Sequence, residues 1–341
     1  MNPEVLDTLP PLISALLAGE TIGLIYWFAL RRPPGARNTL LAISTLLLFS
    51  TPLLIPASLV RLRALAMFLA ADVFFKLVDA TRRAREYQAS SSTFADWLRF
   101  LIPFPILLVT GEERQAARHL TTPLAVAAIR FAVGLIVFPF CWVALFAMQH
   151  SDLLRTSFAL DHVVKVALFV LTLEVVNILS LGLDRLTGFE TKPLINRIGI
   201  SRTPAEFWLR YNTRIHAWLT RNVFIPVGGF RRPVRGVFLV FFVSAVMHEA
   251  AFDIALSRVD GYQFSFFVLQ IPAVLASPAL ERFAKRGGIG TKILAHVITI
   301  AWLVATAVLF FRGVGQIFPF LYTAEPPPPL FGEWTFAPAP H

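Results

Sequence analysis

The chain has 341 residues and a formal net charge of +10, with 56% hydrophobic and only 15% charged residues. Its mean hydropathy of +0.66 lies far from the balance of a soluble globular domain. This composition excludes an ordinary soluble fold. It predicts an all-α integral membrane protein, because helices satisfy their own backbone hydrogen bonds in lipid.

Eight apolar windows are long enough to cross a bilayer, since about 20 helical residues span roughly 30 Å of hydrocarbon. The windows are residues 9–30, 38–60, 64–80, 123–148, 161–184, 236–257, 262–282 and 291–312. The first follows acidic residues and is predicted to be a retained span rather than a cleaved signal peptide. The third is the weakest because it is short and contains Asp72, Lys76 and Asp79.

Two segments depart from this pattern. Residues 94–111 contain Pro103 and Pro105 and are too short to cross comfortably, so we expect a re-entrant or interfacial segment. The Pro-rich residues 321–341 are expected to form an extended tail, which leaves residues 1–320 as a single polytopic domain. Cys141 is the one cysteine and cannot form an intrachain disulfide.

The distribution of Arg and Lys predicts the orientation. The basic connections are 31–37, 82–85, 113–119, 185–235 and 283–288, whereas 149–160, 258–261 and the residues after 312 hold few basic side chains. With eight spans the two sets fall on opposite sides of the membrane. The positive-inside rule then places the basic connections in the cytoplasm and both termini outside. The compact size favours a bacterial inner membrane.

The connection 185–235 is the most basic part of the chain, because ten Arg and Lys side chains minus two Glu side chains give +8. Membrane topology and attraction to anionic lipid head groups are the ordinary explanations. A soluble polyanionic substrate is the functional alternative.

Within this connection, residues 201–229 are predicted to form a cytoplasmic amphipathic helix. Thr203 suits the cap, Pro204 the first turn, and Glu206 the capping box. The apolar stripe would be Phe207, Tyr211, Ile215, Trp218 and Leu219, the polar side Arg210, Arg214 and Arg221, and the end Pro226, Gly228 and Gly229. Periodicity alone favours a solvated surface position for Asn212, beside the stripe.

Ionisable groups inside spans are costly and mark functional candidates. The polar residues in the windows include Glu20, Asp72, Lys76, Asp79, Lys165, Glu174, Asn177, His248, Glu249 and Asp253. Asp72 and Lys76 are four residues apart and are expected to pair. His162 and Lys165 lie near a span end and are expected to snorkel. Glu174 and Asn177 share a helical face and are expected to hydrogen-bond to a neighbouring helix.

His248 lies about 12 residues into its span, roughly 18 Å deep and therefore near mid-membrane. A zinc protease would need a second histidine at position 252, where the chain has Phe252, so we predict no metal site. Two interpretations stay open, a hydrogen-bonded core histidine and a general base. Desolvation favours neutral imidazole, which can accept a hydroxyl proton. Glu249 points about 100° away around the helix and is expected to pair with a neighbouring span.

Two motifs in order, SRTPAEFWLRYN with its downstream VFIP and then SAVMHEAAF, resemble the membrane-bound O-acyltransferases, most closely the wax-synthase branch. The resemblance covers about residues 193–255. Tyr211 departs from it, because plant wax synthases usually have Trp there. The matching residues are Phe207, Trp208, Arg210, Asn212, Val223, Phe224, Pro226, Ser244, Met247, His248 and Glu249.

The resemblance implies that His248 is the catalytic base and Asn212 the second catalytic residue. We further predict a set of substrate-binding residues: Trp208, Arg210, Tyr211, Arg214 and Glu249. The implied reaction is direct attack of an alcohol on acyl-CoA, without a covalent acyl-enzyme. Since no single helix brings Asn212 and His248 together, their convergence is a prediction of this resemblance.

We therefore expect acyl-CoA as co-substrate without another cofactor, a long-chain alcohol as acceptor giving a wax ester, contact with membrane lipids, and no nucleic-acid partner. Acetylation or acylation of a glycan or another small alcohol is the alternative within the family. From another class, the alternative is a transporter whose buried charges line an ion or proton path.

Overall fold

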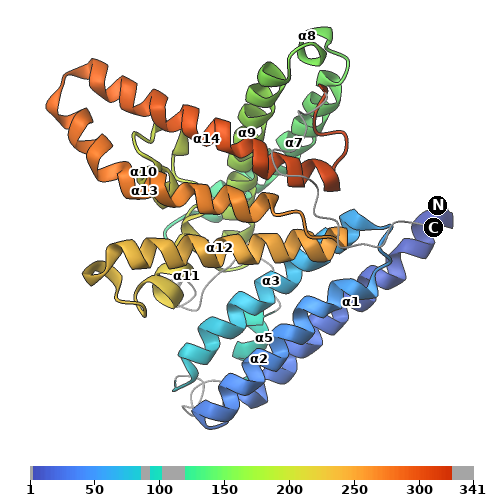
Figure 1. Cartoon of the computed structure of the whole chain (residues 1–341). Coiled ribbons are helices and arrows are strands. Elements are labelled where there is room, and N and C mark those ends of the chain that lie inside the picture. Colours follow the sequence, from blue (N-terminus) through green and yellow to red (C-terminus); the bar gives the residue numbers. More distant parts are fainter. Residues whose placement is uncertain (1–2, 86–92, 102–119, 325–341) are drawn as a thin grey trace. The chain divides into compact units, whose positions relative to one another are not determined.

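The computed structural model describes residues 3–85, 93–101 and 120–324, which form helices and connections without a β-strand (Figure 1). This confirms the predicted all-α class. The described residues divide into two compact units. One contains the residues before 119 together with 250–259, and the other contains 120–249 and 260–324.

The first unit packs its helices around Trp97, which is fully buried and donates its indole N–H to the Gly23 carbonyl at 3.1 Å. Asp72 and Lys76 pair at 2.6 Å in the same unit, as their spacing predicts. Lys76 also donates to the Leu101 carbonyl at 3.2 Å. The elements are α1 (Pro3–Ala29), α2 (Pro34–Ser50), η1 (Thr51–Leu54), α3 (Val60–Arg82) and α5 (Phe94–Leu101), with residues 250–256 of α12.

The second unit contains two prominent helix pairs, α7 with α9 and α13 with α14 (Figure 1). α7 and α9 approach closely at glycines, since a Cβ on Gly182 would lie 2.5 Å from the Phe131 backbone nitrogen. The elements are α7 (Leu124–Met148), α8 (Asp152–Arg155), α9 (Phe158–Leu186), η2 (Ile198–Ile200), α10 (Pro204–Arg210), α11 (Thr213–Leu219), η3 (Thr220–Phe224), η4 (Gly229–Arg231), residues 233–249 of α12 (Pro233–Leu256), α13 (Tyr262–Arg286) and α14 (Ile289–Ile317).

Seven helices in the described ranges are long and apolar enough to cross a membrane: α1, α2 with η1, α7, α9, α12, α13 and α14. Many of their apolar side chains are exposed, such as Phe140 at 64%, as expected of surfaces that face lipid. The chain is thus an integral, multi-pass membrane protein. α3 is long enough but too charged to qualify, so the count of eight spans stays a prediction.

The structure tests the re-entrant segment and the tail only in part. Residues 94–101 form the short helix α5, and 102–111 lie outside the described residues, as do 113–119 and 325–341. The re-entrant path and the extended tail therefore stay predictions.

The expected snorkelling of His162 and Lys165 is wrong, because both side chains are buried. Lys165 lies 3.5 Å from Asp161, and His162 contacts the Tyr322 hydroxyl at 2.7 Å and the Val304 carbonyl at 2.8 Å. The physical reason is that the segment after α14 covers the first turn of α9, where the Thr323 backbone N–H donates to Asp161 at 2.6 Å. These contacts satisfy the polar atoms of His162 and Lys165 within the protein, so the side chains do not have to extend to water.

Candidate active site

The predicted single amphipathic helix is wrong, because it breaks at Asn212. α10 ends at Arg210 and α11 begins at Thr213, while Asn212 itself lies in the left-handed region with φ +45°. The predicted start is confirmed, since Thr203 accepts a hydrogen bond from the Glu206 N–H at 3.2 Å. Asn212 caps α11, its Oδ1 accepting from the Ile215 N–H at 3.3 Å. Its Nδ2 donates to no residue in the described ranges.

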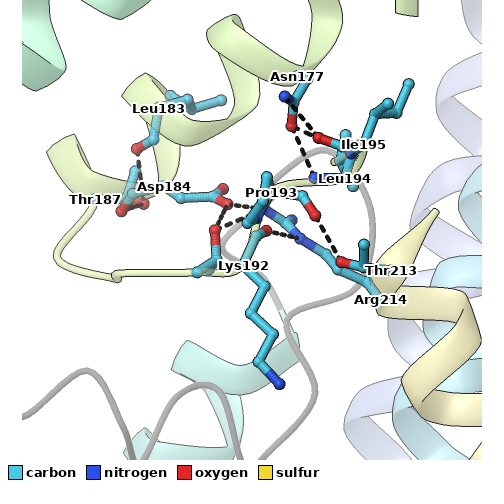
Figure 2. Close-up of polar contacts among 11 residues, drawn as sticks. Asn177, Leu183, Asp184, Thr187, Lys192, Pro193, Leu194, Ile195, Thr213 and Arg214 are labelled. Carbon is cyan, nitrogen blue, oxygen red and sulfur yellow. Dashed lines mark hydrogen bonds and ion pairs between the residues drawn. The ribbon is translucent and has the colours of Figure 1, made fainter. Parts of the chain in front are cut away.

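The break is held by the connection that precedes α10, residues 191–196 (Figure 2). The Asn196 N–H donates to the Arg210 carbonyl at 3.0 Å, and the Thr213 N–H donates to the Leu194 carbonyl at 2.9 Å. The Thr213 hydroxyl adds a bond to the Pro193 carbonyl at 2.6 Å. The backbone on both sides of Asn212 is therefore tied to one connection.

α9 fixes this connection from its other side (Figure 2). Asn177 accepts from the Leu194 N–H at 2.7 Å and donates to the Ile195 carbonyl at 3.3 Å, so it binds a connection rather than a neighbouring helix. Asp184, two helical turns further on, contacts both Arg214 and the Thr191 hydroxyl at 2.6 Å. We call these residues, Asn177, Asp184, 191–196 and Arg214, the Asn212 clamp.

Arg214 is not on a polar face as predicted, because its side chain is fully buried. Besides Asp184, it donates to the Thr191 hydroxyl at 2.6 Å and to the Lys192 carbonyl at 3.1 Å. The break at Asn212 changes the helical phase, so the spacing from Arg210 no longer predicts the direction of Arg214. Its assignment to substrate binding stays a prediction, but its observed contacts are within the clamp.

His248 is half-buried on α12, and its Nδ1 lies 2.8 Å from the Ser244 carbonyl. Since a carbonyl oxygen only accepts, Nδ1 is the donor, and in the neutral imidazole Nε2 then keeps its lone pair. No other hydrogen bond engages the ring within the described part of the chain. The ring of Phe267 lies against the imidazole, with 4.1 Å between centroids. The histidine is thus oriented by its own helix and presents Nε2 as an acceptor.

α10 packs on α13, where the Ala205 N–H donates to the Ser277 hydroxyl at 2.9 Å. The Trp208 ring lies 5.8 Å from the same Phe267 ring that contacts His248. The predicted site residues Trp208 and His248 therefore share a neighbour, although they are 40 residues apart in the sequence. The convergence of Asn212 on His248 stays a prediction.

The remaining candidates have local partners. Tyr211 stacks on Phe207 at 5.4 Å, and burial raises the pKa of its phenol to about 12, so it stays protonated at neutral pH. Arg210 pairs with Glu206 at 2.7 Å. Glu249 accepts from the Gly261 N–H at 2.5 Å and the Phe264 N–H at 2.8 Å, so its carboxylate binds the backbone at the start of α13.

Sequence reasoning missed Asp184, Thr191 and Phe267. Asp184 was detectable, because it lies seven residues after Asn177 and thus on the same face of one helix. Thr191 and Phe267 carry no such signal, since their contacts depend on how separate segments fold together.

These features define a polytopic membrane protein with a tautomer-fixed histidine near the middle of a membrane-capable helix and a clamped asparagine before it in the sequence. The membrane-bound O-acyltransferase family (MBOAT) matches residues 44–310, and the chain belongs to this family.

Similar proteins are named for acyl transfer to lipids. The chain is 29% identical to "Probable sterol O-acyltransferase 2" of Schizosaccharomyces pombe over 31% of its length. It is 25% identical to "Diacylglycerol O-acyltransferase 1C" of Glycine max over 33% of its length. These alignments span 22% of each relative, so the chain covers about a fifth of the proteins it resembles.

Proposed function

We propose that the protein is a membrane O-acyltransferase that moves an acyl group from acyl-CoA to a hydroxyl acceptor, most simply a long-chain alcohol. The observation that carries this proposal is the fixed tautomer of His248. Its Nδ1–H is bound to the Ser244 carbonyl, so Nε2 is available to a substrate in an apolar surrounding. Family membership supports the same chemistry.

The proposed reaction is a direct transfer. The acceptor hydroxyl gives its proton to His248 Nε2 while its oxygen attacks the thioester carbonyl carbon. The tetrahedral intermediate collapses by breaking the carbon–sulfur bond, and the departing thiolate takes the proton from the imidazolium to give free CoA. Asn212 Nδ2 is assigned to the oxyanion, where a preorganised donor lowers the barrier.

The acceptor is the less defined partner. The names of the relatives favour a lipid hydroxyl, of the sterol or diacylglycerol kind, alongside the long-chain alcohol expected from the motifs. A glycan or another small alcohol is the remaining alternative within the family. The transporter alternative has no support in these comparisons, and placement in a bacterial inner membrane rests on the sequence alone.

The test uses purified protein, a long-chain acyl-CoA and four acceptors: a long-chain alcohol, a sterol, a diacylglycerol and a glycan. Release of free CoA thiol and formation of the ester are both measured. We expect His248→Gln to lower the rate about 10²–10⁴-fold, the usual contribution of a general base. Equal rates for the wild type and this variant with every acceptor would remove His248 from the chemistry.

His150→Gln is the matched control. His150 also binds the carbonyl four residues before it, that of Phe146 at 3.3 Å, but it is exposed at the end of α7. Its substitution should leave the rate unchanged.

A further inference from the structure

The indole N–H of Trp208 is buried and has no hydrogen-bond partner among the residues that the structure describes. A buried indole N–H normally finds an acceptor, so an exception in a packed site needs an explanation. Two other tryptophans show the usual pattern. Trp97 donates to the Gly23 carbonyl at 3.1 Å, and Trp302 donates to the Gln270 side chain at 3.3 Å.

The surroundings of Trp208 are aromatic. Its ring lies 5.4 Å from Phe241, 6.1 Å from Phe266 and 5.8 Å from Phe267, with Tyr211 at 5.5 Å. Ring faces are weak acceptors compared with a carbonyl oxygen. The cage therefore positions the indole without supplying the acceptor that its N–H lacks.

The position of Trp208 indicates which substrate it would meet. It contacts Phe241, which lies two turns before His248 on α12, on the side of His248 that is expected to face the cytoplasm. Phe267 is a neighbour of both the Trp208 ring and the imidazole. Acyl-CoA would reach His248 from that side, and its carbonyl oxygens can only accept hydrogen bonds.

We propose that Trp208 donates its N–H to a carbonyl oxygen of the acyl donor, at the thioester or at the adjacent pantetheine amide. This inference rests on the proposed function and gives Trp208 a role in binding the donor rather than the acceptor. Catalysis then has separate partners for the two substrates: Trp208 for the donor carbonyl and His248 for the acceptor hydroxyl.

Trp208→Phe tests the proposal, because it keeps an aromatic ring and removes the N–H. Loss of one hydrogen bond should raise the KM for acyl-CoA about tenfold and change the KM for the alcohol less than twofold. The melting temperature of the variant without substrate should equal that of the wild type, since no hydrogen bond within the protein is lost. The stabilisation produced by acyl-CoA in a thermal-shift measurement should decrease.

Trp302→Phe is the matched control. It removes the bond to Gln270, so it should lower the melting temperature without a selective effect on the KM for acyl-CoA. If Trp208→Phe does not fold, benzothienylalanine at position 208 keeps the shape of indole and replaces the N–H by sulfur.

An unchanged KM for acyl-CoA in either Trp208 variant, or equal increases for both substrates, would overturn the proposal. The same measurements on the wild type distinguish this outcome from a failure of the proposed function. A wild-type protein that acyl-CoA neither stabilises nor converts would overturn both, whereas an active wild type with an equally active Trp208 variant would overturn only this inference.

Discussion

The two ends of the Asn212 amide have different surroundings. Oδ1 caps α11 by accepting from the Ile215 N–H at 3.3 Å, whereas Nδ2 has no partner in the described residues. The backbone at φ +45° is unfavourable for most side chains, and Asn is one of the residues that tolerate it. The residue therefore combines a local structural role with a free pair of donors, which is the combination that an oxyanion site needs.

Asn212→Asp separates these two roles. Asp caps a helix about as well as Asn, so we expect the free energy of unfolding to change by less than about 1 kcal/mol. The amide donors are lost, so the rate should fall about 10²–10³-fold. Asn212→Gly is the companion variant, because it fits the left-handed backbone and also lacks the donors. CoA release and thermal unfolding are measured for both, and a wild-type rate in Asn212→Asp would reduce Asn212 to a cap.

At the scale of elements, the clamp explains why a segment with a helical sequence pattern contains a break. The cap at Thr203 and the end before Pro226 were predictable, because each depends on neighbouring residues. The break was not, since it depends on hydrogen bonds from residues 191–196 and on the buried pair of Asp184 and Arg214. Tertiary contacts outside the sequence window overrode the local periodicity.

The buried pair of Asp184 and Arg214 gives a second prediction. Arg214→Leu leaves the Asp184 carboxylate buried without its cation, so we expect a loss of about 3–5 kcal/mol. The double variant with Asp184→Leu and Arg214→Leu lacks both charges. We expect this double variant to be more stable than the Arg214→Leu single variant. Its kcat should stay below that of the wild type, because the junction at Asn212 loses the ties that Arg214 and Asp184 make to residues 191 and 192.

Unfolding curves and CoA-release kinetics in one detergent measure both effects. Lys285→Leu is the control, since its pair with Glu281 at 2.7 Å is largely exposed and should contribute less than about 1 kcal/mol. A double variant with wild-type kcat would show that the clamp supports folding only.

At the scale of the whole molecule, the membrane topology depends on α3. This helix has 23 residues, about 35 Å at 1.5 Å per residue, which is enough to cross a bilayer. Its charged residues keep it out of the set of seven membrane-capable helices, yet two of them, Asp72 and Lys76, neutralise each other inside the protein. Hydropathy treats a paired charge like a solvated one, so this span is the one that sequence reasoning places least securely. The seven other windows coincide with membrane-capable helices because their signal is purely local.

A cysteine pair decides whether α3 crosses the membrane. If α3 crosses, the connection after α1 and the connection 185–235 lie on the same side of the membrane, as the positive-inside rule requires. If α3 does not cross, these two connections lie on opposite sides.

Gly35→Cys and Gly199→Cys report these two connections on a Cys141→Ala background, because both glycines are exposed and a Cβ would meet nothing within 4 Å. Asp152→Cys, in the short helix α8 that follows α7, reports the opposite side. In vesicles of one orientation, we expect a membrane-impermeant maleimide to label positions 35 and 199 from the same face of the membrane. Position 152 should be labelled only from the opposite face. Labelling of 35 and 199 from different faces would show that α3 does not cross the membrane. If position 199 were then labelled from the outer face, the basic connection, with Trp208 and Asn212, would lie outside the reach of cytoplasmic acyl-CoA.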